Sequence, residues 1–216
     1  MAKTQFVYGL HAVKAMLAQH PKKIVQCYFM RSGNEQIKSL FDQAIAADIP
    51  VTQLSRQELE KKLGDNLVHQ GAALECNAIL EHNEKDIPVL ISAVSQPLVL
   101  VLDQVQDPHN LGACLRSANA MGACCVLIPK DRSAGLTPVA QKVACGATVA
   151  TSVIAVTNLS RTLKKLQDNG LWIVGLSANT DCSLSDIDLS GPIAIVMGSE
   201  GKGMRQLTEK HCDYLA

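Results

Sequence analysis

The sequence predicts an α/β protein whose larger part is a parallel sheet with helices on both faces. From residue 98 onward, short and almost continuously apolar runs alternate with amphipathic segments, which is typical of strands buried between two helix layers. The 216 residues, 47% of them hydrophobic, are enough for one large domain or two small ones with a sizeable core. No apolar run approaches the ~18 residues of a membrane span, and the N-terminus lacks the pattern of a signal peptide. We therefore expect a cytoplasmic protein without a membrane segment.

The first part of the chain predicts a small α/β unit. Apolar residues at helical spacing alternate with buried-strand runs and with turn or capping signals. In order, we expect a helix over 9–19 that Pro21 stops, a strand over 24–30, a helix over 34–47, a strand over 49–54, a brief helix opened by the capping-box pair Ser55 and Glu58, and a strand over 71–80.

A change of character separates this unit from the rest. Residues 79–97 are polar and acidic at first and are then bracketed by Pro88 and Pro97, so we interpret them as a linker. The predicted domains are therefore 1–78 and 98–216. In the second domain we expect strands over 98–102, 124–129, 152–156, 171–176 and 193–197, and helices from Asn110 to about Met121, from Thr137-Pro138 onward, and over 158–169 up to Gly170.

The net charge and the spacing of the cysteines argue against several classes of protein. The 20 basic and 20 acidic residues cancel, which by itself argues against a long nucleic-acid footprint. Residues 1–62, however, hold nine Lys/Arg against five acidic residues, whereas the chain from 96 onward is balanced. The eight cysteines are scattered without metal-ligand spacing, so we interpret them as small buried hydrophobic residues and expect neither a metal site nor disulfides.

Ligands of open parallel sheets bind beyond the carboxyl ends of the strands, so the loops there are candidates for the site. In the loop and helix over 103–123, Asn110 suits an N-cap, and Arg116 lies off the apolar stripe of the helix. Taken singly, Asn110 is better explained as a plain helix cap and Arg116 as a solvated surface cation.

The second loop, MGSEGKGMRQL at 197–207, is rich in glycine. Gly198, Gly201 and Gly203 permit positive φ angles and close approach of a ligand. The spacing matches neither a P-loop nor a dinucleotide fingerprint. Because Glu200 would repel phosphates, the loop favours a neutral or cationic ligand. In a third loop, over 175–190, the small residues at its start leave room for a flat adenosine-sized group, although an ordinary strand exit explains them equally well.

Two of these loops resemble a known family. DPHNLGACLRSANAMGA at 107–123 and VMGSEGKGM at 196–204 are similar to motifs one and two of the SpoU/TrmH family of RNA ribose 2'-O-methyltransferases, in the SPOUT superfamily. The resemblance extends to FVYGLHAV, HQGAALE, IPKDRSA, KVACGA and WIVGL, and is greatest to members that methylate a guanosine of 23S rRNA.

This resemblance implies a C-terminal SPOUT (α/β knot) domain that dimerises and an N-terminal domain like ribosomal protein L30e that binds RNA. It implies S-adenosylmethionine as methyl donor and no metal. Asn110, Arg116 and Glu200 match the family's catalytic motif residues, with Glu200 expected to hold Asn110 or Arg116. The methyl-donor site would comprise Gly175, Leu176, Ser177, Ala178, Met197, Gly198, Gly201 and Gly203.

The family's third motif should follow a segment like LTEKHCDYLA, but the sequence stops there, at Ala216. We therefore expect the sheet domain to lack its last strand and helix in this chain, and we expect the chain to be an incomplete form.

Three functions remain open at this stage. The preferred one is methylation of a guanosine 2'-OH in 23S rRNA, with a tRNA 2'-O-methyltransferase of the same family as its rival. A non-catalytic RNA-binding or ribosome-assembly protein is the third. For phosphate contact we favour a basic patch, expecting RNA binding that weakens with salt, and we give less weight to His11, His69 and His109. The patch comprises Lys14, Lys22, Lys23 and Arg31.

Overall fold

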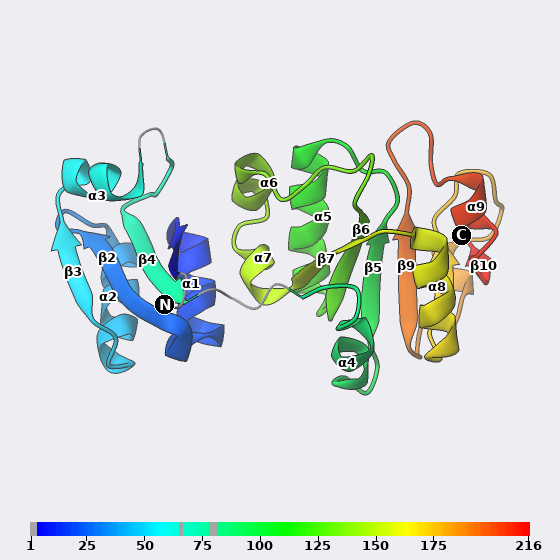
Figure 1. Ribbon diagram of the computed structural model, residues 1–216, viewed down its shortest axis with the longest axis horizontal. Coiled ribbons are helices and arrows are strands. Elements are labelled where there is room, and N and C mark those ends of the chain that lie inside the picture. Colours follow the sequence, from blue (N-terminus) through cyan, green and yellow to red (C-terminus); the bar gives the residue numbers. More distant parts are fainter. Residues whose placement is uncertain (1–3, 65–66, 78–81) are drawn as a thin grey trace. The chain divides into compact units, whose positions relative to one another are not determined.

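The computed structural model describes residues 4–64, 67–77 and 82–216 and divides the chain into two compact units (Figure 1). The first unit takes the chain up to residue 80 together with 145–150, and the second takes 81–144 and 151–216. A short segment from the second half of the sequence thus packs with the first unit.

The first unit is built on a mixed sheet of four strands in the order β1-β4-β2-β3. The strands are β1 (Thr4–Tyr8), β2 (Ile24–Met30), β3 (Val51–Leu54) and β4 (Ala72–Asn77). β2 and β3 are parallel, whereas β4 is antiparallel to both β1 and β2. The sequence analysis missed β1. Its identity as a strand comes from pairing with β4, from Thr4 opposite Asn77 to Tyr8 opposite Ala73, and such distant pairing leaves little local signal.

Helices cover this sheet unequally. α1 (Leu10–Gln19) and α2 (Glu35–Ala46) bury their apolar stripes in one cluster with the inner residues of the strands. α7 (Ala147–Ala150) adds Val149 to this cluster. α3 (Arg56–Leu63) begins at the predicted capping box of Ser55 and Glu58 and buries Leu59 on the opposite face. A short 3-10 helix, η1 (Pro21–Lys23), leads into β2.

The second unit contains a six-stranded parallel sheet in the order β10-β8-β9-β5-β6-β7. Its strands are β5 (Leu98–Leu102), β6 (Cys125–Pro129), β7 (Ser152–Val156), β8 (Trp172–Gly175), β9 (Ile193–Met197) and β10 (Tyr214–Leu215). The five predicted strands are confirmed to within a residue or two. The final residues add a short strand, β10, beside β8, which was not among the predicted strands.

Side chains are buried on both sides of this sheet. Val101 of β5 lies in a cluster with α4 (Ile87–Ser92) and α8 (Leu159–Asp168). The next residue, Leu102, points the opposite way and is buried outside that cluster, as are Leu111 and Leu115 of α5 (Pro108–Ala120). α6 (Pro138–Val143) begins at the predicted Thr137 cap and packs on α5. Two further short helices, η2 (Leu184–Asp186) and α9 (Gln206–Glu209), lie in the loops that follow β8 and β9.

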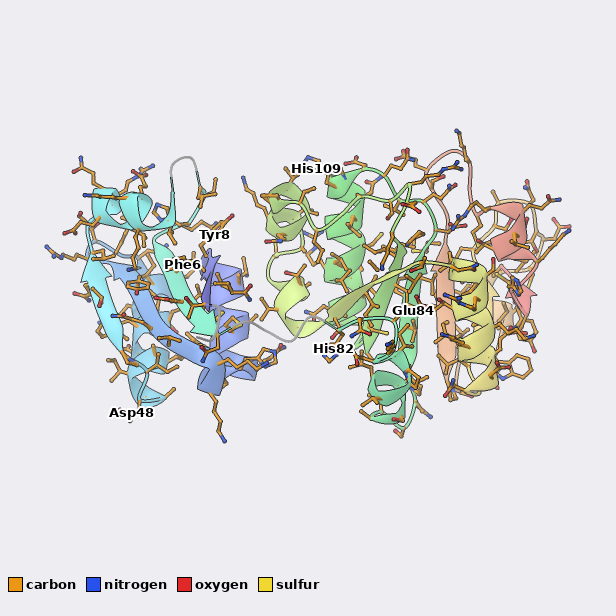
Figure 2. All side chains as sticks on the ribbon, viewed as in Figure 1. Phe6, Tyr8, Asp48, His82, Glu84 and His109 are labelled. Carbon is orange, nitrogen blue, oxygen red and sulfur yellow. The ribbon has the colours of Figure 1, made fainter. Side chains whose placement is uncertain are left out.

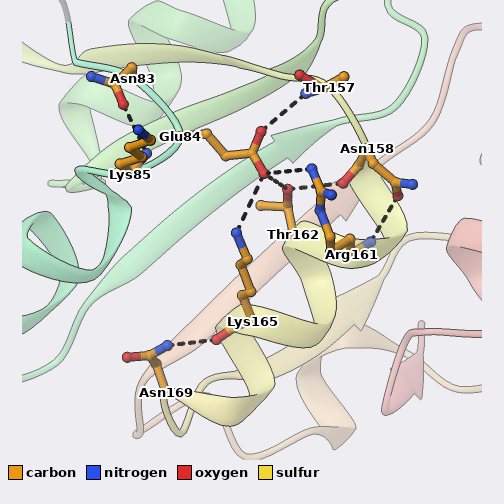
Figure 3. Close-up of polar contacts among 9 residues, drawn as sticks. All are labelled: Asn83, Glu84, Lys85, Thr157, Asn158, Arg161, Thr162, Lys165 and Asn169. Atoms are coloured by element: carbon orange, nitrogen blue, oxygen red, sulfur yellow. Dashed lines mark hydrogen bonds and ion pairs between the residues drawn. The ribbon is translucent and has the colours of Figure 1, made fainter.

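The described part of the expected linker packs on the second unit. Residues 78–81 lie outside the described residues, but from residue 82 the chain enters α4, whose Ile87 and Ile91 are buried. Glu84 holds this segment to α8 (Figure 3). Its carboxylate lies 3.6 Å from both Arg161 Nη2 and Lys165 Nζ, and it accepts hydrogen bonds from Thr157 N and Thr162 Oγ1.

The cysteines differ from the expectation of uniform burial. Cys27, Cys76 and Cys125 are buried, but Cys145 and Cys182 are exposed. Across the described ranges, no helix has the length and apolarity to cross a membrane.

Candidate active site

The strand order locates the candidate site. β5 and β9 are adjacent and in register from Leu98 opposite Ile193 to Leu102 opposite Met197. From β5 the chain moves outward to β6 and β7, whereas β9 enters between β5 and β8. The order therefore reverses between β5 and β9, and ligands of open parallel sheets bind beyond the carboxyl ends of strands at such a reversal. The two glycine-containing and polar loops predicted from the sequence both start there.

The loop after β5 is capped differently from the prediction. α5 begins at Pro108, and its N-cap is Asp107, whose Oδ1 accepts a hydrogen bond of 2.8 Å from His109 N. The prediction that Asn110 is the N-cap was wrong, because proline fits the first helical position and the aspartate preceding it can cap. Asn110 lies instead in the first turn, where its side chain is not needed as a cap.

The loop after β9 folds back on itself. Ser199 N donates to Gly203 O at 3.0 Å, and Gly203 N donates to Ser199 O at 2.9 Å. A side chain at Gly198 would overlap the backbone of Gly203, so this close return requires glycine. Gly201 and Gly203 have φ angles of +81° and +67°. This turn presents Glu200 at its exposed tip.

Asn110 and Glu200 meet across the two loops. Asn110 Nδ2 donates to Glu200 Oε2 at 3.0 Å, although the residues are 90 positions apart. A hydrogen bond to an ionised carboxylate is stronger than one between neutral groups. Of the two partners considered for Glu200, the structure gives Asn110.

An ion pair between a buried carboxylate and a partly exposed guanidinium joins the same two loops. Asp103 directly follows β5 and is fully buried. Its Oδ1 accepts from Arg205 Nε at 2.8 Å and lies 2.7 Å from Nη2, while its Oδ2 accepts from Arg205 N at 2.9 Å. Asp103 N also donates to Met197 O at 2.7 Å. The end of β5 is thereby tied to both ends of the glycine loop.

Sequence reasoning missed Asp103 and Arg205. The available signal was an acidic residue placed immediately after the apolar run LVLVL, at the ligand-binding edge of the sheet. A buried carboxylate needs a partner, because an unpaired buried charge costs several kcal/mol (about 3–5 on breaking such a pair). The partner could not be identified without knowing that the β9 loop returns to this point.

The Arg116 side chain does not contact Asn110 or Glu200. It is exposed on α5. Six residues at about 100° each place its side chain on a different face of the helix from Asn110, and ~9 Å along the axis. Among the described residues, Arg116 has no hydrogen bond or ion pair. Its guanidinium is therefore accessible to a ligand.

The third loop starts beside the glycine loop. Gly175 lies opposite Val196 in the β8–β9 pair, and Leu176 N donates to Val196 O at 2.8 Å. Leu176 and Met197 are half-buried at these adjacent strand ends. Ser177 N donates to Ala216 O at 2.8 Å, and Ala178 is exposed. The four residues 175–178 thus line the strand exit next to Met197.

The absence of a side chain at Gly175 serves internal packing. A Cβ there would lie 2.7 Å from both Cys212 Sγ and Met204 Cε, so these side chains take the space that the sequence analysis left for a ligand. Burial, followed by the charges of Asp213, Glu209 and Asp103, raises the pKa of Cys212 to about 12. This thiol therefore stays protonated at neutral pH. Among the described residues, no group of three His, Cys, Asp or Glu could hold a metal ion.

The basic residues favoured for RNA contact do not form one patch. Lys14 on α1 and Lys22 in η1 are exposed and Lys23 is half-buried, all before β2 begins, whereas the exposed Arg31 follows its last residue. The seven residues of β2 separate the two ends by about 20 Å. Of the histidines, His11 and His109 are exposed, while the buried His69 accepts a hydrogen bond from Gly71 N through Nδ1, a structural role.

Comparisons with known proteins cover both units. Residues 97–216 match the SpoU rRNA Methylase family, and residues 6–82 match the RNA 2'-O ribose methyltransferase substrate binding family. Two relatives are named 23S rRNA (guanosine-2'-O-)-methyltransferase RlmB. The one from Pseudomonas putida is 45% identical over all of this chain and 87% of its own length. The one from Coxiella burnetii is 47% identical over all of this chain and 86% of its own length.

Solved structures share the fold. The SpoU methyltransferase AviRb from Streptomyces viridochromogenes, in complex with AdoMet, is 18% identical and matches with a TM-score of 0.70 over 98% of this chain and 79% of its own. A structure described as an RNA 2'-O ribose methyltransferase is 20% identical and matches with a TM-score of 0.72 over 100% of this chain and 79% of its own. Together with the family match over the whole sheet unit and the RlmB relatives over the full chain, this establishes that the protein belongs to the SpoU rRNA methylase family.

Proposed function

We propose that the protein transfers a methyl group from S-adenosylmethionine to the ribose 2'-OH of a guanosine in 23S rRNA. The RlmB relatives, 45% and 47% identical over the full chain, support the reaction and the substrate. The structural observation that carries the proposal is the hydrogen bond from Asn110 to Glu200, which holds the two motif loops together beyond β5 and β9. The tRNA alternative has no comparable support.

The strand exits suit the methyl donor. S-Adenosylmethionine combines a flat adenine with a cationic sulfonium, which supplies an electrophilic methyl group when bound. Leu176 and Met197 offer half-buried apolar surface at neighbouring strand ends, and the Glu200 carboxylate suits a cation nearby. We assign donor binding to the backbone of 175–178 and of 197–203, which includes Gly198, Gly201 and Gly203.

The motif residues would align and stabilise the reacting groups. Methyl transfer needs the 2'-oxygen in line with the methyl group, so positioning accounts for much of the rate. We propose that Arg116 binds an adjacent RNA phosphate and stabilises the negative charge that develops on the 2'-oxygen. A guanidinium stays protonated in proteins and therefore does not serve as a general base. Asn110, fixed by Glu200, would orient the ribose or the loop.

Further parts of the proposal concern assembly. The first unit would bind the RNA substrate, as its match to the substrate-binding family suggests. The protein would act as a homodimer through the second unit, in the cytoplasm where ribosomes are made.

The reaction would need no metal. Full activity in the presence of EDTA would support a metal-free reaction, and loss of activity that Mg²⁺ or Zn²⁺ restores would contradict it.

The test measures transfer of labelled methyl groups from S-adenosylmethionine to unmodified transcripts of 23S rRNA and of tRNA. We expect incorporation into the rRNA alone; incorporation only into tRNA would favour the rival. Calorimetry with S-adenosylmethionine separates both from a non-catalytic RNA-binding protein. Clear binding of the donor is expected, and its absence would contradict an enzymatic role.

A further inference from the structure

The outer face of the first unit's sheet is only half covered. α1 and α2 bury the inner face, and α3 covers one end of the outer face by packing Leu59 against Tyr28 and Ala73. Beyond that end, the outer side chains stay accessible. Phe6 on the edge strand β1, labelled in Figure 2, has 40% of its surface exposed. Phe6 therefore presents an aromatic ring on the uncovered part of this face.

Strand register places a polar row beside this ring. Phe6 is opposite Glu75 of β4, which is in turn opposite Gln26 of β2. Gln26 Nε2 donates to Thr52 Oγ1 of β3 at 2.7 Å, so the row continues onto the fourth strand. Because strands are ~4.8 Å apart, the row is about 14 Å long. Glu75, Gln26 and Thr52 are all partly exposed.

A cation lies beside this row. Lys62 Nζ on α3 is 4.5 Å from the centroid of the Tyr28 ring and 5.8 Å from that of Phe6. The two ring centroids are 6.3 Å apart. The Tyr28 hydroxyl lies 3.0 Å from Gln26 Oε1 and 3.3 Å from Glu75 Oε2, to either of which it donates. The aromatic rings thus hold the ammonium group next to side chains that can read base edges.

We propose that Phe6, Glu75, Gln26 and Thr52, with Lys62 beside the row, form the surface on which an unpaired stretch of the RNA substrate lies. Proteins recognise single-stranded RNA by stacking bases on aromatic rings, contacting phosphates with cations and bonding base edges with polar side chains. Glutamine and glutamate suit such edges, because their amide and carboxylate oxygens accept from base amino groups.

The family match selects RNA as the occupant, because residues 6–82 match the RNA 2'-O ribose methyltransferase substrate binding family. Residues 1–80 carry nine Lys/Arg against seven acidic residues, and Glu60, two positions before Lys62, is paired with Arg56 at 2.8 Å. Glu75 is the one acidic member of the row itself, and the Tyr28 hydroxyl donates toward it. The inference rests on the proposed function only in taking RNA as the substrate; it assigns the residues that contact it.

The test uses the full chain and a fluorescein-labelled 12-nucleotide single-stranded RNA, with binding followed by fluorescence anisotropy. Phe6→Leu keeps an apolar side chain but removes the aromatic face, and we expect it to weaken binding about tenfold. Phe6→Trp should retain the affinity. Ile45→Ala, at a 54% exposed apolar residue on α2, is the matched control and should leave the affinity unchanged. Circular dichroism melts check that every variant is folded.

Lysine variants test the cation separately. Lys62→Gln should reduce the slope of log affinity against log salt by about 0.7, whereas Lys38→Gln at an exposed position on α2 should leave it unchanged. Methyl transfer to a 23S rRNA transcript is then measured: Phe6→Leu should raise KM for the RNA, with kcat and donor affinity unchanged.

The outcomes separate this inference from the proposed function. If Phe6→Leu binds RNA as tightly as the wild type and the wild type methylates 23S rRNA, the proposed RNA-binding surface is wrong and the proposed function still stands. RNA binding that depends on Phe6, without any methyl transfer to 23S rRNA by the wild type, would support the surface and contradict the function. If Phe6→Leu changed only the sedimentation coefficient of the protein, the row would be a contact between copies and the inference would be wrong.

Discussion

The Glu200 side chain is held by a hydrogen bond, whereas the Arg116 side chain is not, and this difference suggests different roles. Glu200 is fixed by Asn110 Nδ2 at 3.0 Å, whereas Arg116 has no hydrogen bond or ion pair to any described residue. A preorganised group stabilises a transition state without a reorganisation cost, while a free cation on a helix is suited to a ligand that arrives with its own negative charge. We therefore expect Glu200 to act through the loop and Arg116 through the RNA.

Replacing Arg116 tests this division. In Arg116→Ala we expect methyl transfer to fall by about 10²-fold or more, because one positioned charge in a transition state contributes on that order. Affinity for S-adenosylmethionine, measured by calorimetry, should stay within about twofold, well below the ~1.4 kcal/mol that a tenfold change represents. Lys164→Ala, at an exposed position on α8, is the charge-matched control. Loss of donor binding in Arg116→Ala would refute the assignment.

Only some residues of the site could be predicted from the sequence. Asn110, Arg116 and Glu200 could be selected because they lie in motifs that resemble a family. Asp103 and Arg205 are 102 positions apart and meet only because the β9 loop returns to the end of β5. Local patterns do not encode such a meeting.

At the scale of elements, apolar runs predicted strands well. β5, β7 and β9 have the predicted bounds, since strands buried on both faces are apolar at nearly every position. β1 and α4 were missed because neither has a sufficient local signal. α4 has only six residues, and Pro88 within it suggests a turn, yet proline is acceptable in the first turn of a helix. Burial of Ile87 and Ile91 in the sheet cluster stabilises it.

The glycine loop gives a prediction at this scale. In Gly198→Ala the new Cβ would overlap the backbone of Gly203, so the turn between Ser199 and Gly203 has to open. We expect at least about tenfold weaker binding of S-adenosylmethionine, equal to ~1.4 kcal/mol or more. Gly191→Ala is the matched control, because a Cβ there meets nothing within 4 Å. Equal donor affinity in the two variants would show that the loop does not depend on this close approach.

At the scale of the whole molecule, net neutrality conceals the distribution of charge. The zero balance argued against RNA, but the basic excess lies in the first 62 residues. The structure also separates Lys22 and Lys23 from Arg31 at opposite ends of β2. The strand predicted over 24–30 already implies this separation, because an extended strand of seven residues holds its two ends about 20 Å apart.

Stability of the second unit should depend on pH through Glu84. Burial raises the pKa of Glu84, but the hydrogen bond from Thr157 N and the charges of Lys165 and Arg161 outweigh it, so the net pKa lies below its ordinary value. A carboxyl group with a lowered pKa in the folded state contributes stability above its unfolded pKa of about 4.3, and this is lost as pH falls through the folded value.

We therefore expect Glu84→Gln to lower the free energy of unfolding by about 1 kcal/mol at pH 7 and by much less at pH 3. Urea unfolding followed by fluorescence of Trp172, the single tryptophan, reports on the second unit. Asp131→Asn, at an exposed position, controls for loss of a charge. An equal effect of Glu84→Gln at both pH values would contradict the role of its ionised form.

The most direct test of the central claim is nucleoside analysis of an unmodified 23S rRNA transcript incubated with the protein and S-adenosylmethionine. Digestion to nucleosides and mass spectrometry should show one 2'-O-methylguanosine per transcript with the wild type and, after the same short incubation, about a hundredth of that yield or less with Arg116→Ala. A methyl group on a base, or on the ribose of another nucleoside, or equal yields with both proteins, would contradict the account.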